Sequence, residues 1–185
     1  MAVFLRVFLA AALGLAAGCD RSAPGDSASQ QPRFEPERFF AGHVRSWGVI
    51  ENRSGDPTAR FTADIQGWHD GPVLVIEQRF AFDDGRKQER VWRLRRIDDH
   101  RYEAWANDVV GTAIGEAHGN AFRLEYTLAI DPGNALKNVH MKQWMYAVGD
   151  GSAMMNRVTV TKWGVTIAEV TESFLRDQPP PLASE

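Results

Sequence analysis

The chain has few of the features that cross-link a fold or carry it across a membrane. It has one cysteine, Cys19, among 185 residues, so an internal disulfide is excluded and the folded part must be stabilised by core packing. No apolar run reaches the roughly 18 residues of a spanning helix. We therefore expect no membrane-spanning helix in the mature protein.

Sequence patterns typical of catalysis and metal binding are also missing. The five histidines show neither a His-x-His nor a His-Glu-x-x-His spacing, and there is no Gly-x-Ser-x-Gly elbow or phosphate loop. We assign no catalytic residue, metal or cofactor. The formal net charge of −3 without a basic stripe argues against nucleic acid as a partner.

The amino terminus has the pattern of an export signal. Residues 1–18 combine a charged start, an apolar stretch and small residues, and the end of this segment, Ala16-Ala17-Gly18-Cys19, resembles a bacterial lipobox. We predict cleavage before Cys19 and acylation of that cysteine, which places the protein in the bacterial envelope, facing the periplasm. An ordinary cleavage signal at the same bond is the alternative. Asp20 resembles a retention signal for the inner membrane, but the choice between inner and outer membrane stays open.

The region after Cys19 has the composition of a linker. Asp20 to Gln31 is small, polar and without periodicity, which is typical of a flexible tether. We predict a tether over residues 19–38, a folded domain over 39–176 and a disordered tail over 177–185. One short helical turn is expected near Glu35 to Phe39.

The folded region shows turn signals about every ten residues, with alternating segments between them. In one such segment Phe122, Leu124 and Tyr126 alternate with polar or small residues, as in a half-buried strand. About ten strands are predicted, near residues 42–51, 58–68, 72–82, 86–97, 101–107, 109–118, 121–130, 139–148, 152–163 and 165–175.

Strands joined by short turns favour one architecture. An all-β, antiparallel up-and-down barrel removes the exposed sheet edges. We therefore predict a lipocalin-like (calycin-type) barrel, a fold whose interior can hold one small ligand.

Five stretches of the chain resemble a family of uncharacterised proteobacterial lipoproteins that is labelled domain of unknown function 3833. They are FFAGHVRSWGV (39–49), DDGRKQERVWRL (83–94), NDVVGTAIGEAHGNAFRLEY (107–126), QWMY (143–146) and MNRVTVTKWGVTIAEVT (155–171). The resemblance implies this fold and an envelope location, and it supplies no catalytic residues. Because members often look like companions of fatty-acid-modifying membrane systems, it also suggests a membrane-protein partner.

One face of a predicted strand carries only glycine and alanine, and we call it the bare face. In Val109 to Gly119, strand alternation puts Gly111, Ala113, Gly115, Ala117 and Gly119 on the same side. Glycine inside a strand marks a bend or a close approach by something bulky. The face is either a slot for an apolar ligand, such as an acyl chain, or a curved strand against which a neighbouring tryptophan packs.

Four further positions could contribute to an interior site. Trp92 and Trp144 lie mid-strand and should be buried, as core residues or as the lining of a cavity. Arg90 shares a face with Trp92 and either holds a ligand carboxylate inside the barrel or forms a solvated cross-strand pair. Asn156 is a candidate buried polar residue, as are Asp108 and Glu169.

The function that fits this pattern best is binding or carrying a lipid or other apolar ligand by a membrane-anchored lipoprotein. Acyl chains on Cys19 would make the membrane itself a partner. One alternative is a packed barrel that serves as a non-enzymatic accessory subunit of a fatty-acid-modifying membrane system. Another is an enzyme with carboxylates inside the barrel.

Overall fold

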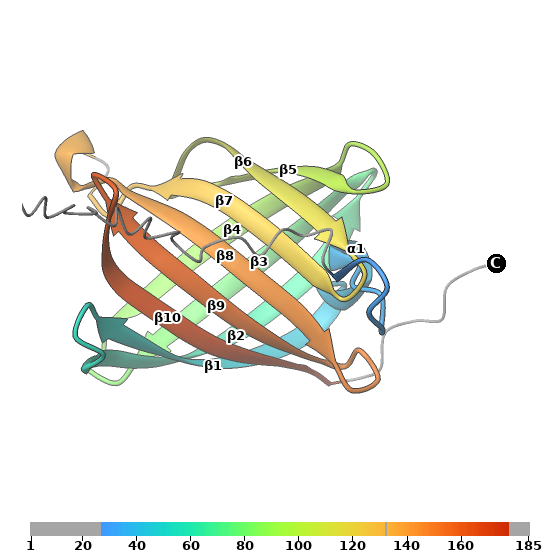
Figure 1. The fold of residues 1–185 in the computed structure, drawn as a ribbon, viewed down its shortest axis with the longest axis horizontal. Coiled ribbons are helices and arrows are strands. Elements are labelled where there is room, and N and C mark those ends of the chain that lie inside the picture. Colours follow the sequence, from blue (N-terminus) through green and yellow to red (C-terminus); the bar gives the residue numbers. More distant parts are fainter. Residues whose placement is uncertain (1–26, 132, 178–185) are drawn as a thin grey trace, which may run out of the picture.

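The protein is a closed antiparallel barrel of ten strands in which each strand pairs with its neighbours in sequence and β10 closes onto β1 (Figure 1). The computed structural model describes residues 27–131 and 133–177. The strands are β1 Gly42–Asn52, β2 Pro57–Asp70, β3 Val73–Phe82, β4 Lys87–Arg96, β5 Arg101–Ala106, β6 Val109–His118, β7 Ala121–Leu128, β8 Val139–Val148, β9 Ala153–Lys162 and β10 Val165–Arg176. The predicted all-β up-and-down barrel is confirmed, and the strand bounds lie close to those expected.

The alternation of side chains along each strand places the core inside the barrel. On β2 the buried residues Phe61, Ala63 and Ile65 alternate with exposed polar ones. On β7 Phe122 and Leu124 are buried in the same way. Because side chains two apart share a face, each strand contributes one row to a common apolar interior.

A short segment before the first strand closes one end of the barrel. Helix α1 (Pro36–Phe39) lies at that end (Figure 1), and Phe34, Phe39 and Phe40 are 2–5% exposed. Phe40 packs so closely on β2 that a Cβ at Gly67 would lie 1.9 Å from its carbonyl oxygen. We call this segment, residues 34–40, the plug.

The plug shifts the domain boundary from its predicted position. The predicted tether extends to residue 38, but Phe34 is buried and its backbone N–H donates to the carbonyl of Gly119 (2.8 Å). The segment from Phe34 to Arg38 therefore belongs to the folded domain, because its aromatic side chain and helical turn complete the core. The expected turn near Glu35 is present as α1.

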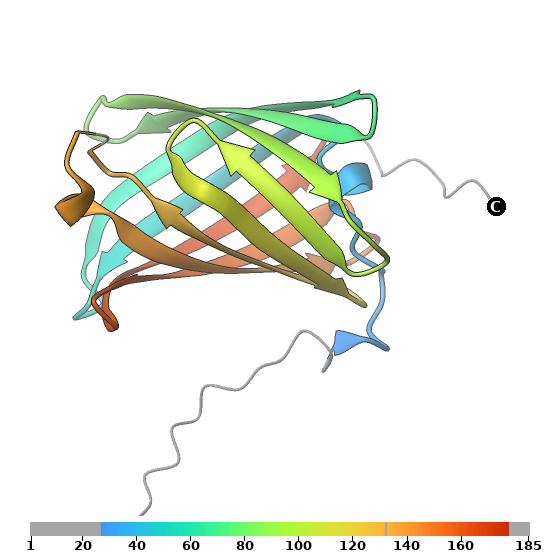
Figure 2. The same ribbon diagram turned by 90° about the horizontal axis from the view of Figure 1, so that it is seen from above.

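The other end of the barrel is the mouth, formed by the turns β1–β2, β3–β4, β5–β6 and β9–β10 and the β7–β8 loop. This loop carries the 3-10 helix η2 (Ala135–Lys137), which lies at the end opposite α1 (Figure 2). Residues lining the mouth, such as Ile50, Phe82 and Leu128, are half-buried. The barrel interior is therefore more accessible here than at the plug.

Strand β6 departs from the predicted alternation. Its pairing with β7 shifts between Val110 and Ile114, and Gly111 sits at this irregularity with φ +73° and with open space where a Cβ would stand. Gly111 is exposed, so its predicted place on the inner face is wrong. The bulge moves it out of register with Ala113 and Gly115, which are buried.

Two predictions concern parts of the chain outside the described residues. The predicted signal peptide and Cys19 precede Ser27, the first described residue, and the predicted tail lies beyond Asp177, the last described residue, except for Asp177 itself. Among the described residues no helix is long and apolar enough to cross a membrane.

Candidate ligand site inside the barrel

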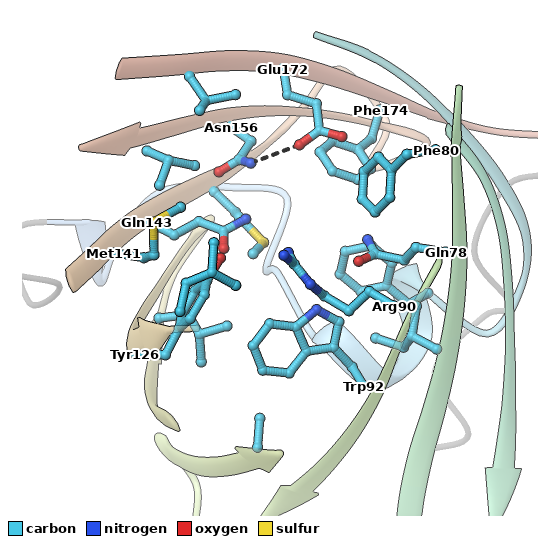
Figure 3. Close-up of a pocket in the computed structure, with 18 of the residues that line it drawn as sticks. Gln78, Phe80, Arg90, Trp92, Tyr126, Met141, Gln143, Asn156, Glu172 and Phe174 are labelled. Atoms are coloured by element: carbon cyan, nitrogen blue, oxygen red, sulfur yellow. Dashed lines mark hydrogen bonds between the residues drawn. The ribbon is translucent and has the colours of Figure 1, made fainter. Parts of the chain in front are cut away.

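A cavity of about 200 Å³ lies in the barrel interior, on the mouth side of the plug. Most of its lining is apolar, and Figure 3 shows polar side chains reaching the same space from different strands. These polar side chains include Gln78, Arg90, Tyr126, Gln143, Asn156 and Glu172. The cavity is thus an apolar space with a small number of polar groups, the usual composition of a small-molecule site.

Arg90 points into the barrel and is paired there with a carboxylate of the protein itself. Its Nε and Nη2 donate to Asp108, with 2.9 Å from Nε to each oxygen and 2.7 Å from Nη2 to Oδ2. Both side chains are about one-seventh exposed. Burial lowers the pKa of Arg90, but Tyr126 and Asp108 more than offset this, so the guanidinium stays charged.

This pair decides between the two interpretations of Arg90. The side chain faces inward, as the ligand-binding interpretation requires, and it is not a solvated surface pair. However, the carboxylate that it holds is Asp108, which precedes β6. The charge of Arg90 is therefore already neutralised, and the cavity does not present a bare cation.

Glu172 on β10 is the second buried carboxyl group at the cavity. It is 7% exposed and accepts hydrogen bonds from Ser46 Oγ (2.7 Å) and Asn156 Nδ2 (3.1 Å; Figure 3). Burial raises the pKa of Glu172 to about 7, although the hydrogen bonds from Ser46 and Asn156 act in the opposite direction. The group can hold or release a proton near neutral pH.

Sequence reasoning missed Glu172 and named Glu169 as a buried polar residue instead. Glu169 lies on the outside, where it pairs with Arg157 (3.1 Å). Strand alternation could have identified Glu172, because it lies two residues from Phe174, a core residue, and so shares its face of β10. The register irregularity between Thr166 and Ala168 interrupts that parity in the first part of β10.

Asn156 has a hydrogen-bonding atom without a partner. The side chain is 2% exposed, and its Nδ2 donates to Glu172, but its Oδ1 accepts no hydrogen bond from the part of the chain that the structure describes. A buried acceptor left unpaired costs free energy. A ligand that donates a hydrogen bond to Oδ1 would remove this cost.

Trp92 and Trp144 occupy different faces of the barrel. Trp92 is buried, lines the cavity and packs edge-on against Tyr126, with ring centroids 5.1 Å apart. Trp144 is half-buried on the outer face, where it stacks on Tyr146. The expectation that Trp144 is buried is wrong, because β8 turns Met141, Gln143 and Met145 inward and Trp144 outward.

The space beside the bare face of β6 is occupied by other residues of the protein. A Cβ at Gly115 would lie 2.7 Å from the ring of Phe122 and 3.2 Å from Cβ of Tyr102. The Gly119 Cβ position is similarly occupied by the backbone of Ser27. The packing interpretation holds for Gly115, with a phenylalanine in place of the expected tryptophan. Of the predicted ligand residues, the cavity brings together Arg90, Trp92 and Asn156.

The histidines form local contacts. His43 bridges Asp64 and Asp177, which raise its pKa, and His100 stacks on His118 with ring centroids 4.3 Å apart. Within residues 27–131 and 133–177, no three metal-ligating side chains lie close enough together to hold an ion.

Comparison with known proteins relates these features to a family and a fold. The sequence matches the family of proteins of unknown function called DUF3833 over residues 13–176. The chain belongs to this family. No curated protein sequence matches it.

Two solved structures have a similar fold. One is the S-type phycobiliprotein lyase CPES from Guillardia theta, with 12% identity and a TM-score of 0.60 over 79% of this chain and 94% of that one. The other is Rv2717c from M. tuberculosis, with 14% identity and a TM-score of 0.56 over 78% and 99% of the two chains. At this identity they show that the DUF3833 chain shares a barrel fold with them.

Proposed function

We propose that this DUF3833 protein is a membrane-anchored binding protein that takes a compact, largely apolar ligand with one polar end into its barrel. The observation that carries the proposal is Asn156 Oδ1, which accepts no hydrogen bond from the described residues and lies beside Glu172 in a largely apolar cavity. A barrel that served only as a packed scaffold would gain stability from apolar residues at these positions.

The size of the cavity limits the ligand. An apolar protein cavity of about 150 Å³ can hold a benzene molecule, and drug-sized ligands occupy pockets of roughly 300–1,000 Å³. At about 200 Å³, the barrel has room for one ring or a short length of acyl chain. A longer ligand would extend through the mouth.

The charges in the cavity restrict the chemistry of the ligand's polar end. Arg90 is neutralised by Asp108, and the pKa of Glu172 near 7 makes this carboxyl largely protonated below neutral pH. A neutral donor, such as a hydroxyl or a protonated carboxyl group, can bond to Asn156 Oδ1 without bringing a net charge into the barrel. Burying an unpaired charge would cost several kcal/mol.

The membrane anchor is the other half of the proposal. It is supported by the Ala16-Ala17-Gly18-Cys19 pattern, which predicts acylation of Cys19 in a bacterial envelope. The described chain contains the whole barrel and its plug. The anchor would therefore localise a complete binding module on the periplasmic side.

Binding can be tested with ligands that differ only at the polar end. Native mass spectrometry of the purified protein should show a co-purified small molecule, and calorimetry should detect binding of octanol or octanoic acid. Val158 is buried and lines the cavity, so Val158→Phe should fill it and abolish binding. Thr159→Phe is the matched control, because it places the same ring on the outer face of β9.

The outcomes separate the proposal from its rival. If Val158→Phe loses binding while Thr159→Phe keeps it, the ligand enters the barrel. If the wild type binds neither compound and carries no co-purified molecule, the cavity is not a site for ligands of this kind and the binding proposal fails. The accessory-subunit interpretation, with a membrane enzyme as partner, would then replace ligand binding.

A further inference from the structure

One side of the mouth exposes an unusual number of apolar side chains. Trp163 in the β9–β10 turn is 85% exposed, Leu136 in η2 is 74% exposed and Ile130 at the start of the β7–β8 loop is 59% exposed. Val165 and Ile167 on β10 are also exposed. We call these five residues the apolar tip. The β7–β8 loop and the β9–β10 turn are neighbours, since β8 pairs with β9.

The backbone at Trp163 shows that this tryptophan is not placed there for the stability of the turn. Trp163 has φ +49° and Gly164 has φ +79°, so both central residues of the hairpin adopt left-handed conformations. Such turns favour Asn-Gly, and a bulky residue at positive φ is strained. Strain of this kind is often retained where the side chain has a function.

Basic groups lie next to the apolar side chains. Lys162 donates from Nζ to the carbonyl oxygen of Leu136, which links the hairpin to the neighbouring loop, and its Nζ lies 5.0 Å from the centre of the Trp163 ring. Lys137 is more than half exposed beside its ion-pair partner Asp131. Tryptophan and aliphatic side chains accompanied by lysine are the usual composition of surfaces that sit at a membrane interface.

Two other turns of the mouth differ in composition from the apolar tip. The β1–β2 and β3–β4 turns carry Asp56, Asp83 and Asp84 together with basic residues, and Arg60 pairs with Asp83 (3.9 Å) and Arg86 with Asp84 (2.6 Å). Exposed apolar side chains accompanied by lysine therefore occur at the apolar tip, whereas acidic and basic side chains pair with one another at these two turns. An anionic bilayer would gain both burial of apolar surface and contact with Lys162 on the side of the apolar tip, so this side favours approach to the membrane.

We propose that the apolar tip inserts into the headgroup region of an anionic lipid bilayer, with Lys137 and Lys162 against the lipid headgroups. Insertion of Trp163 and Leu136 removes their apolar surface from water, and it brings the mouth of the barrel to the membrane. The proposal rests on the rim alone and does not require that the cavity bind a ligand or that Cys19 be acylated.

The test uses the chain from Asp20 onward, which keeps every strand and the plug and lacks the predicted signal and anchor. The protein should co-sediment with vesicles of phosphatidylglycerol and phosphatidylcholine, less with phosphatidylcholine alone, and less at high salt because screening weakens the charged contacts. Trp163→Asn should weaken vesicle binding by about tenfold or more. Its melting temperature should stay equal or rise, because asparagine tolerates left-handed backbone.

Trp68→Thr is the control. Trp68 is 44% exposed near the plug end of β2, where threonine suits a strand, so this variant should bind vesicles like the wild type. Equal binding by wild type and Trp163→Asn, or no binding to anionic vesicles, would overturn the proposal. Concentration-dependent self-association that Trp163→Asn abolishes, without vesicle binding, would also overturn it and assign the tip to a contact between two copies.

Discussion

Arg90 on β4 donates a bidentate pair of hydrogen bonds to Asp108, in the turn between β5 and β6 at the mouth of the barrel. Gln88 Nε2 donates to the same carboxylate at 3.2 Å. The pair continues the β4–β5 register, in which Trp92 lies opposite Ala106, two residues further into the β5–β6 turn. It therefore braces the β5–β6 turn against β4 and neutralises the cation at the cavity.

Removing one partner of this pair should be costly. Asp108→Ala leaves the Arg90 charge without its carboxylate in a largely buried position, and we expect a loss of about 3–5 kcal/mol in the free energy of unfolding. The double variant Arg90→Met/Asp108→Ala should recover part of this loss, because no unpaired charge remains. Urea denaturation of the wild type and of these two variants measures the free energies of unfolding. Glu169→Ala, which breaks the exposed pair with Arg157, should cost less than about 1 kcal/mol. A loss that small for Asp108→Ala would contradict the bracing role.

The pH dependence of stability should report on Glu172. Burial raises its pKa to about 7 from the ordinary 4.5, so the folded state binds its proton more tightly than the unfolded state does. The resulting stabilisation is fully present below about pH 4.5 and is lost as the pH rises to about 7, for a total of up to about 3 kcal/mol. Glu172→Gln should be more stable than the wild type at pH 8 and should lose this part of the pH dependence.

His43 must be separated from Glu172 in that measurement. Its pKa is also raised, by Asp64 and Asp177, so it too stabilises the fold at low pH. The comparison of wild type with Glu172→Gln, repeated in a His43→Gln background, isolates the glutamate. Parallel pH profiles for the two proteins in each background would show that Glu172 has an ordinary pKa in the folded state.

Gly115 tests whether the bare face of β6 is packed or open. The ring of Phe122 occupies the position of a side chain there, so Gly115→Ala should destabilise the barrel by about 1–3 kcal/mol through overpacking. Adding Phe122→Leu should reduce the penalty, because the shorter side chain leaves the Cβ position free. Gly111→Asn is the control and should be nearly neutral, since nothing lies near that position and asparagine accepts its positive φ. A neutral Gly115→Ala would indicate an open slot, as a ligand site on this face requires.

Acylation of Cys19 can be tested independently of the barrel. Protein isolated from a bacterial membrane should begin at Cys19 and carry acyl chains in mass spectrometry, and it should partition into detergent. Cys19→Ala should yield soluble or unprocessed protein with the same strand-dominated circular dichroism. An unmodified Cys19 in the membrane-derived wild type would refute the anchor.

The order of the strands could be predicted from local patterns because an up-and-down barrel pairs only neighbours in sequence. Phe122, Leu124 and Tyr126 alternate with polar side chains, and short turns at Asp70-Gly71 and Asp84-Gly85 leave each strand only the next one to pair with. The inward direction of Arg90 followed from its parity with Trp92, although that parity alone could not exclude a surface pair.

The partners inside the barrel were decided by tertiary structure. Glu172 meets Ser46 from the far end of the sequence, where β10 closes onto β1, and no local spacing encodes this contact. Asp108 lies opposite Arg90 in the continued β4–β5 register, but it follows the end of β5, where strand alternation no longer specifies the direction of a side chain. The β6 bulge that exposes Gly111 and the register irregularity in β10 shift the parity on which sequence reasoning depends. Alternation specifies which face a side chain occupies only while the register is regular. The sequence by itself thus determined the barrel and its strand order, and closure of the barrel determined which polar groups share its cavity, because only closure brings strands distant in the chain around one interior.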